Sequence, residues 1–238
     1  MERYASLHRW MIIPFVIIQA GIFRYYWPDF TTQSWEIHVH YWLVTAWYSW
    51  LILQPYLISQ KKIDKHRTMG MIGLVLAGGF LFTAFSLLDI PLKIIENFDP
   101  AKVPVPVSFY YGTLVTEAIL TMTVAYAIYQ AVRHRKNMSE HAWWLICTAF
   151  YMIGPALGRG MIVFWRAVLP PESLSPVYPL LSTELIYIPL FLLFARKFGS
   201  FRHPATVIGL LLVVLRFLRF PIGSIEWVQQ LLEMVIKY

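Results

Sequence analysis

The stretch HYWLVTAWYSWLILQPYLISQKKIDKHRTMG, residues 40–70, places an apolar run between two histidines and closes it with basic residues. The apolar part, residues 41–58, is long enough to cross the roughly 30 Å hydrocarbon core of a bilayer as a helix. The basic residues that follow it are Lys61, Lys62, Lys65 and Arg67. An apolar helix followed by a basic segment is typical of a membrane span that ends on the cytoplasmic side. The stretch therefore predicts a helical membrane protein.

The composition of the whole chain agrees with this prediction. The 238 residues are 58% hydrophobic and 14% charged, whereas soluble domains carry roughly a quarter charged residues. The net charge of +7 would suggest a nucleic-acid ligand in a soluble protein, but here the basic residues lie between apolar runs. We therefore expect a lipid bilayer as the partner and no nucleic acid. The single cysteine, Cys147, excludes a disulfide within the chain and a thiolate metal site.

Seven apolar runs predict seven transmembrane helices in an all-α bundle. The expected spans are Trp10–Trp27, Val39–Ile58, Met69–Ile90, Phe109–Val132, Ala142–Val168, Leu180–Ala195 and Ala205–Phe220. We expect residues 1–220 to form this transmembrane domain. Residues 221–238 have apolar positions at helical spacing beside glutamates, which predicts a C-terminal amphipathic helix along a surface.

Basic and acidic connections alternate along the chain. The segment before the first span and the connections at 61–67, 133–136 and 196–202 hold 12 of the 20 lysines and arginines. The intervening connections carry aspartates and glutamates instead. Because cytoplasmic loops of membrane proteins are enriched in Lys and Arg, the N-terminus is expected in the cytoplasm and the C-terminus outside. The expected location is the bacterial inner membrane.

Ionisable residues fall inside three of the expected spans. Glu117 lies in the fourth, Arg159 in the fifth and Glu184 in the sixth, at similar depth in the outer half of the membrane. Because a charge in the bilayer is costly unless paired, we expect Arg159 to contact Glu117 or Glu184. Tyr110 and Tyr187 lie on the same helix faces as the glutamates and extend this buried polar network. The network either fixes helix packing only, or forms a proton path or the polar end of a ligand pocket.

Two further arginines, Arg216 and Arg219, lie at the end of the seventh expected span. Long basic side chains near helix ends commonly extend to the membrane surface while their stems stay in lipid. We therefore expect both to point outward and to take no part in the network.

Histidines and one glutamine mark the ends of the expected helices. His40, Trp47 and Gln54 recur at seven-residue intervals and share one face of the second span. His66 and His141 each stand at the cytoplasmic start of a span, so they approach each other if the third and fifth helices are neighbours. We interpret His66, His141, His40 and Gln54 as candidate cofactor-binding residues. The alternative is that each histidine is a solvated residue of the membrane interface.

Seven residues carry a resemblance to known proteins: His40, Gln54, His66, Arg67, Gly70, His141 and Arg159. Their combination resembles a family of uncharacterised bacterial multi-pass membrane proteins, and is more distantly similar to the cytochrome b561 group. In that group, histidines on successive helices bind haem and pass electrons across the membrane. The resemblance covers helices two to five and implies a haem b or quinone site near His66 and His141, with these two as the iron ligands of a haem. The fourth span holds no histidine to pair with His40, which departs from the two-haem pattern of the group.

Three functions are open on the sequence. The first is a membrane electron-transfer protein that binds haem or quinone. The second is a proton-linked transporter or channel that uses the buried polar network. The third is an accessory subunit of a larger membrane complex, which contacts other subunits through its aromatic residues (17%) and its C-terminal helix. The chain shows no Walker loop, no Gly-x-Ser-x-Gly elbow and no zinc-protease pattern, and its seventh span lacks a lysine for a retinal Schiff base.

Overall fold

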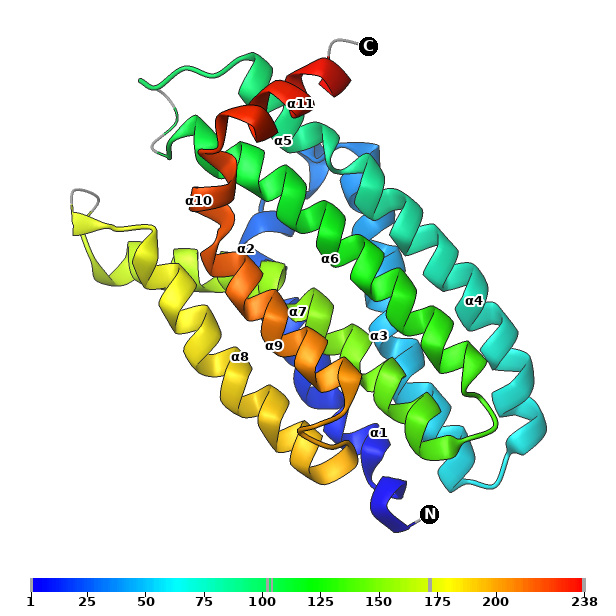
Figure 1. The fold of residues 1–238 in the computed structure, drawn as a ribbon. Coiled ribbons are helices and arrows are strands. Elements are labelled where there is room, and N and C mark those ends of the chain that lie inside the picture. Colours follow the sequence, from blue (N-terminus) through cyan, green and yellow to red (C-terminus); the bar gives the residue numbers. More distant parts are fainter. Residues whose placement is uncertain (1, 102, 104, 171–172, 237–238) are drawn as a thin grey trace.

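The computed structural model of the chain is a bundle of long helices that run up and down side by side (Figure 1). It describes residues 2–101, 103, 105–170 and 173–236, and these residues contain helices and no β-strand. The long helices are α2 (Ile12–Tyr26), α3 (Trp35–Ser59), α4 (Ile63–Ser86), α6 (Val107–Arg133), α7 (Met138–Val168), α8 (Val177–Phe198) and α9 (Pro204–Phe217). The shorter helices are α1 (Leu7–Trp10), α5 (Asp89–Glu96), α10 (Arg219–Gly223) and α11 (Glu226–Ile236), with single 3₁₀ turns at Glu2–Tyr4 and Phe30–Thr32. Each apolar run of the sequence therefore forms a helix, as expected.

Four helical segments of the described chain are long and apolar enough to cross a membrane. They are Ile63–Glu96, Val107–Arg133, Met138–Val168 and Val177–Phe198. The helices α2 and α9 are shorter, with 15 and 14 residues. The 25-residue α3 holds four tryptophans and three tyrosines, whose N–H and O–H groups lower its hydropathy. The structure is thus a membrane-type helical bundle with four candidate spans.

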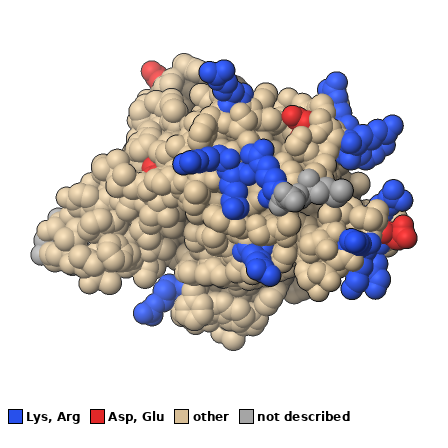
Figure 2. Space-filling model, turned by 90° about the horizontal axis from the view of Figure 1, so that it is seen from below, with Lys and Arg blue, Asp and Glu red and all other residues tan. Residues whose placement is uncertain are grey.

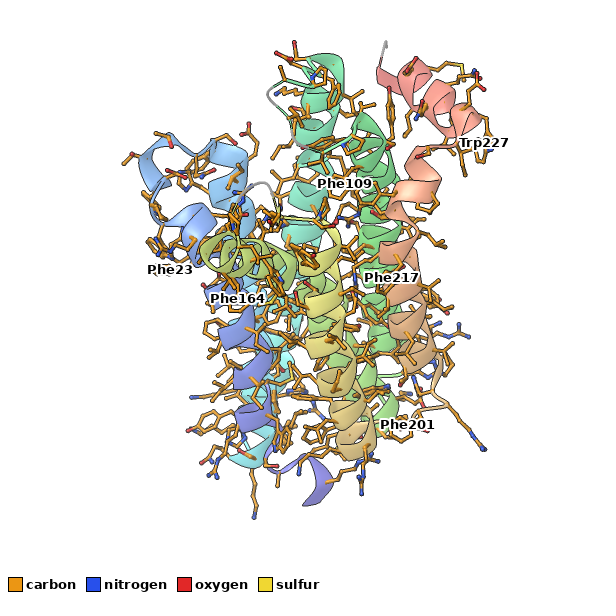
Figure 3. The ribbon with its side chains drawn as sticks, turned by 90° about the vertical axis from the view of Figure 1, so that its left-hand side faces the viewer. Phe23, Phe109, Phe164, Phe201, Phe217 and Trp227 are labelled. Carbon is orange, nitrogen blue, oxygen red and sulfur yellow. The ribbon has the colours of Figure 1, made fainter. Side chains whose placement is uncertain are left out.

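The helix α7 is the centre of the bundle and contacts α2, α6, α8 and α9. A Cβ added to Gly21 of α2 would collide with the backbone of Ala156, so α2 and α7 touch backbone to backbone. Pro155 lies inside α7, where its ring removes a backbone hydrogen bond and favours a bend. Beyond this point, α7 leaves the direction of the bundle and runs crosswise to the neighbouring helices (Figures 1 and 3).

The N-terminus and the basic connections lie at one end of the bundle, which we name the basic end. Arg3 donates hydrogen bonds to the carbonyl oxygens of Lys197 (2.5 Å) and Gly199 (2.7 Å) after the last turns of α8. A cation at this position also complements the negative end of the helix dipole. Figure 2 views the molecule from this side and shows many Lys and Arg side chains with few acidic ones.

The C-terminal helix α11 lies at the opposite end (Figure 1). It is amphipathic, as the sequence predicted, with Val228 buried and Trp227 and Leu231 exposed by 65% and 50%. Glu233 accepts a hydrogen bond of 2.8 Å from the hydroxyl of Tyr111 on α6. This bond and the buried valine hold α11 against the bundle.

Candidate functional site

Gln54, His66 and His141, which we name the histidine site, come together near the basic end. His66 lies in the first turn of α4 and His141 in the first turn of α7. Gln54, in the last turns of α3, is 4% exposed and contacts His66. The two imidazoles are close enough for their charges to interact, with no direct hydrogen bond between them in the described chain. The structure therefore places both histidines near the basic end, at the start of α4 and of α7.

The orientation of the Gln54 amide is fixed by its neighbours. An indole N–H only donates, so the amide atom 3.1 Å from Trp50 Nε1 is the oxygen. The amide nitrogen then lies 2.5 Å from Nδ1 of His66 and 3.3 Å from the His66 carbonyl oxygen. Because the amide nitrogen donates, Nδ1 accepts, and the proton of the neutral ring is on Nε2. His66 therefore presents an N–H donor on its other nitrogen.

Trp50 packs against α4 and fixes the position of the Gln54 amide beside His66. Its Nε1 also donates to the carbonyl oxygen of Met69 at 2.8 Å. Its ring lies on Gly73, where an added Cβ would collide with the indole. On its other side it stacks on Trp47, with ring centroids 4.9 Å apart. The glycine is therefore required for the indole to reach both of its acceptors.

The proton of His141 is on the other ring nitrogen. Nδ1 lies 2.8 Å from the carbonyl oxygen of Ala131 on α6. A carbonyl oxygen only accepts, so Nδ1 carries the proton and Nε2 keeps its lone pair. The two neighbouring imidazoles thus have opposite character: His66 donates through Nε2, and His141 accepts through Nε2.

These proton positions test whether the two histidines fit a haem iron, which needs a nitrogen lone pair from each ring. His141 fits, because a ring N–H bonded to a carbonyl is usual for a metal-bound histidine. His66 does not fit, because Nδ1 faces Gln54 and Nε2 carries the proton. The described residues also contain no group of three or more His, Cys, Asp or Glu that could hold a metal ion. In this arrangement the pair is therefore unsuited to bind haem through both rings.

The surface of α4 beside His66 is open. Gly70 lies one turn further along the same helix face, and an added Cβ there would meet no atom within 4 Å. His66 itself is half-buried. This face leaves room for a flat ligand to lie against the helix backbone next to the imidazole.

His40 belongs to the opposite end of the bundle. It precedes Gln54 by 14 residues in α3, which is about 21 Å along the helix. Its Nδ1 lies 3.0 Å from Thr83 Oγ1 on α4, and its ring interacts with the charge of Arg159. The four predicted cofactor-binding residues are therefore divided between two places, with His40 outside the histidine site.

Five charged residues gather in the half of the bundle that contains His40, and we name them the charge cluster: Glu117, Arg159, Glu184, Arg216 and Arg219. Arg216 binds Glu184 through two bonds, Nε to Oε1 at 2.5 Å and Nη2 to Oε2 at 2.8 Å. Arg219 donates to Glu117 at 3.2 Å. Arg159 makes no ion pair with any described residue and is exposed. The glutamates do lie near Arg159, but the prediction that it pairs with one of them is wrong.

The prediction that Arg216 and Arg219 point outward is also wrong, and the reason is the path of the chain after α9. The short helix α10 packs back onto α6 instead of continuing α9 to the membrane surface. Added Cβ atoms on Gly112 and Gly223 would collide with the backbone of Arg219 and Ser108, so α10 and α6 approach backbone to backbone. This close approach turns Arg219 toward Glu117 on α6, whereas Arg216 lies in the last turn of α9 and faces Glu184 on α8.

The two predicted tyrosines differ in their relation to the charge cluster. Tyr187 is 1% exposed, and the guanidinium carbon of Arg216 lies 4.7 Å from its ring centroid. Tyr110 packs beside Phe109 and makes no hydrogen bond within the described part of the chain. Tyr187 is therefore part of the cluster and Tyr110 is not.

The two ion pairs of the charge cluster, Arg216–Glu184 and Arg219–Glu117, differ in how many of their hydrogen-bonding groups have a partner. Glu117, Arg219, Arg216 and Pro155 line a cavity of about 10 Å³, which is the space of a single water molecule. Nε of Arg219 is buried without a hydrogen-bond partner in the described chain, whereas Arg216 uses two nitrogens on its glutamate. The Arg216–Glu184 pair is the tighter of the two.

Reasoning from the sequence assigned no site role to Trp50, Arg216 and Arg219. A signal for Trp50 was present, because it precedes Gln54 by four residues and so lies on the same helix face. A signal for the arginines was present in the charges, because five arginines accompany two glutamates in the expected spans. Choosing the true partners required the packing of α9 and α10, which no local pattern gives.

No protein-family model, curated protein or solved structure matches the chain. The resemblance to the cytochrome b561 group stays a prediction, and the function is argued from the geometry.

Proposed function

We propose that the protein spans the bacterial inner membrane seven times, with the basic end and the N-terminus in the cytoplasm and the C-terminus outside. Support comes from the four candidate spans, from the three further helices that run beside them, and from the lysines and arginines at the basic end (Figure 2). In this orientation the histidine site lies toward the cytoplasm and the charge cluster lies in the outer half of the membrane.

Thiol labelling tests this orientation. Cys147 is fully buried, so Cys147→Ser gives a background without a native thiol. Lys62→Cys at the basic end and Asn97→Cys after α5 introduce exposed thiols at opposite ends. In right-side-out cells, an impermeant thiol reagent should label only the second variant. Labelling of both positions from one side would contradict the orientation.

We further propose that the histidine site binds a quinone. The observation that carries this proposal is the pair of imidazoles with opposite proton positions beside the open surface at Gly70. A quinone has carbonyl oxygens that accept hydrogen bonds, and its reduced form has hydroxyls that donate them. The Nε2–H of His66 suits the carbonyl, and the Nε2 lone pair of His141 suits the hydroxyl.

Each residue of the site has a defined part in such binding. A bound quinone would supply the exchange of two electrons and two protons. Gln54 and Trp50 keep His66 as the donor that orients the headgroup, and His141 offers its Nε2 lone pair to the proton of the hydroxyl. The position near the basic end gives that proton a route to the cytoplasm. The apolar tail would lie in lipid along α4, where Val75 is 78% exposed.

The alternative of a proton-linked transporter has less support. A proton path would have to join the histidine site to the charge cluster along the interface of α3, α4 and α7. Trp47 and Phe80 occupy this interface, 1% and 2% exposed, with ring centroids 5.1 Å apart. Closely packed rings of this size leave no space for a chain of water molecules between the two sites.

Quinone binding can be measured by the quenching of tryptophan fluorescence, because Trp47 and Trp50 lie next to the site. The purified protein is titrated with a ubiquinone that carries a decyl tail. Saturable quenching is expected, and His66→Ala should weaken binding by about tenfold, the value of one lost hydrogen bond.

The matched control uses two open glycines of α4. Gly70→Leu fills the space beside His66 and should abolish binding, whereas Gly78→Leu adds the same side chain at another open position and should bind as the parent does. Equal binding by the parent and Gly70→Leu would overturn the proposal, as would a parent that binds no quinone. A Soret band in the purified protein that disappears in His66→Ala would assign the site to haem instead.

A further inference from the structure

The last part of α7, residues 156–168, lies outside the histidine site and runs crosswise to the neighbouring helices, in the half of the molecule away from the basic end (Figures 1 and 3). Two contacts fix its position. A Cβ added to Gly160 would lie 3.1 Å from Cα of Gly21 on α2. Nε1 of Trp165 donates to Oγ of Ser182 on α8 at 3.0 Å. The segment is therefore held in one rotation about its axis, with defined faces.

These faces have opposite character. Arg159 and Arg166 are seven residues apart, which places them on the same side of the helix. Phe164 and Val168 lie on the other side, 51% and 57% exposed. Figure 3 shows Phe164 at the flank of the bundle, outside the packed core. A helix with two exposed apolar residues opposite two arginines is typical of a segment that lies in the plane of a membrane surface.

Neither arginine is neutralised within the described chain. The side chain of Arg159 makes one hydrogen bond there, to the carbonyl oxygen of Pro155 in its own helix at 3.3 Å. The glutamates of the charge cluster are paired with Arg216 and Arg219, and Arg159 makes no ion pair with a described residue. Arg166 is exposed and makes no hydrogen bond or ion pair with a described residue. A guanidinium keeps its proton in a protein, so this face carries two positive charges that need an anion.

We propose that residues 156–168 form an interfacial helix of the outer leaflet, and that Arg159 and Arg166 bind phospholipid phosphate groups. The planar guanidinium matches two phosphate oxygens at once, which makes arginine the usual side chain for this task. Phe164 and Val168 then enter the acyl region on the other side of the helix. The inference rests on the membrane insertion proposed above and is independent of quinone binding.

The test measures the contact between this face and lipid headgroups. Val163 lies between the two arginines on the same side of the helix, so Val163→Cys in the Cys147→Ser background carries a bimane fluorophore there. The protein is placed in nanodiscs of phosphatidylcholine that contain phosphatidylglycerol with a nitroxide on its headgroup. Quenching of the bimane reports how strongly this lipid is enriched at the site.

The decisive variant replaces both arginines by glutamine. We expect its preference for the labelled phosphatidylglycerol to fall by about 20-fold, since each basic side chain near an anionic surface contributes a factor of about five. Replacement of both arginines by lysine should keep most of the preference. Arg24→Gln, which removes a charge from the same end of the bundle on α2, should leave it unchanged. All these side chains are exposed, so the thermal unfolding midpoint should stay that of the parent.

Three outcomes would overturn the proposal. The first is equal quenching in the parent and the glutamine variant. The second is displacement of the lipid by inorganic phosphate at millimolar concentration, which would assign the arginines to a soluble anion. The third is quenching of the bimane by a water-soluble collisional agent but not by the lipid nitroxide, which would place this face in water.

Discussion

Arg216→Met removes one member of the tighter ion pair of the charge cluster. Its partner, Glu184, has a side chain that is 3% exposed, and both carboxylate oxygens accept from the guanidinium. The substitution therefore leaves a carboxylate buried without a cation. Breaking such a pair costs about 3–5 kcal/mol of the free energy of unfolding. The loss of the contact between the guanidinium and the ring of Tyr187 places the expected value in the upper part of this range.

The other two arginines of the charge cluster provide the comparison. Arg219 and Glu117 have side chains 20% and 28% exposed and share one bond of 3.2 Å, so Arg219→Met should cost about 1–2 kcal/mol. Arg159 is exposed and unpaired in the described chain, so Arg159→Met should change the free energy of unfolding by less than about 0.5 kcal/mol. The loss in the free energy of unfolding should therefore be largest for Arg216→Met, smaller for Arg219→Met and smallest for Arg159→Met.

The measurement is unfolding in mixed micelles of increasing sodium dodecyl sulfate content, followed by far-ultraviolet circular dichroism. Combining Arg216→Met with Glu184→Gln should recover part of the lost stability, because the neutral amide is less costly to bury than an unpaired carboxylate. Combining Glu184→Gln with Arg159→Met should recover no stability, because Arg159 is not the partner of Glu184. If Arg159→Met were the most destabilising of the three, or Arg216→Met as stable as the parent, the assignment of the pairs would be refuted.

Three further changes test other contacts. Gly73→Ala should displace the Trp50 indole from α4 and lower the free energy of unfolding by about 1–3 kcal/mol. It should also weaken the quenching of tryptophan fluorescence by quinone, and unchanged quenching would show that the indole does not position the site. Gly112→Ala should separate α10 from α6 and speed proteolysis of the chain after α9, whereas a parent-like digestion pattern would contradict the close backbone contact. Tyr111→Phe removes the hydrogen bond to Glu233 and should speed hydrogen exchange in α11, at a cost of about 1 kcal/mol; equal exchange would mean that the bond does not hold this helix.

The helices were predictable from the sequence because each apolar run is bounded by basic, acidic or proline-rich connections. The boundaries were less predictable, and α4 shows why. It begins at Ile63, before the expected Met69, because Lys65 and Arg67 stand on exposed positions of its first turns and interrupt the apolar run without interrupting the helix. Hydropathy marks where a helix is apolar, whereas the helix itself extends to the last residue that completes its backbone hydrogen bonds.

The location of His66 and His141 at the same end of the bundle was predictable because both residues start apolar helices that follow basic connections. The partners of Glu117 and Glu184 were not predictable, because depth along a helix does not tell which neighbour it faces. For Glu184 that choice depends on how α9 packs beside α8, and for Glu117 on α10, whose return onto α6 needs a glycine on each helix and has no periodic signature. The proton positions on the two imidazoles could not be predicted from the sequence, because they too depend on tertiary neighbours. They are set by the Trp50 indole and by the carbonyl of Ala131, which tertiary packing brings to the rings.

Infrared difference spectroscopy of an isotope-labelled quinone bound to the protein is the most direct measurement of the histidine site. A hydrogen bond from the Nε2–H of His66 weakens one carbonyl bond of the quinone. That carbonyl stretching band should therefore lie at lower frequency in the parent than in a detergent micelle, and should return to the micelle frequency in His66→Ala. His134→Ala, which removes a half-buried histidine at the same end, should keep the shifted band. A band at the same frequency in the parent, in His66→Ala and in the micelle would contradict the proposed role of His66.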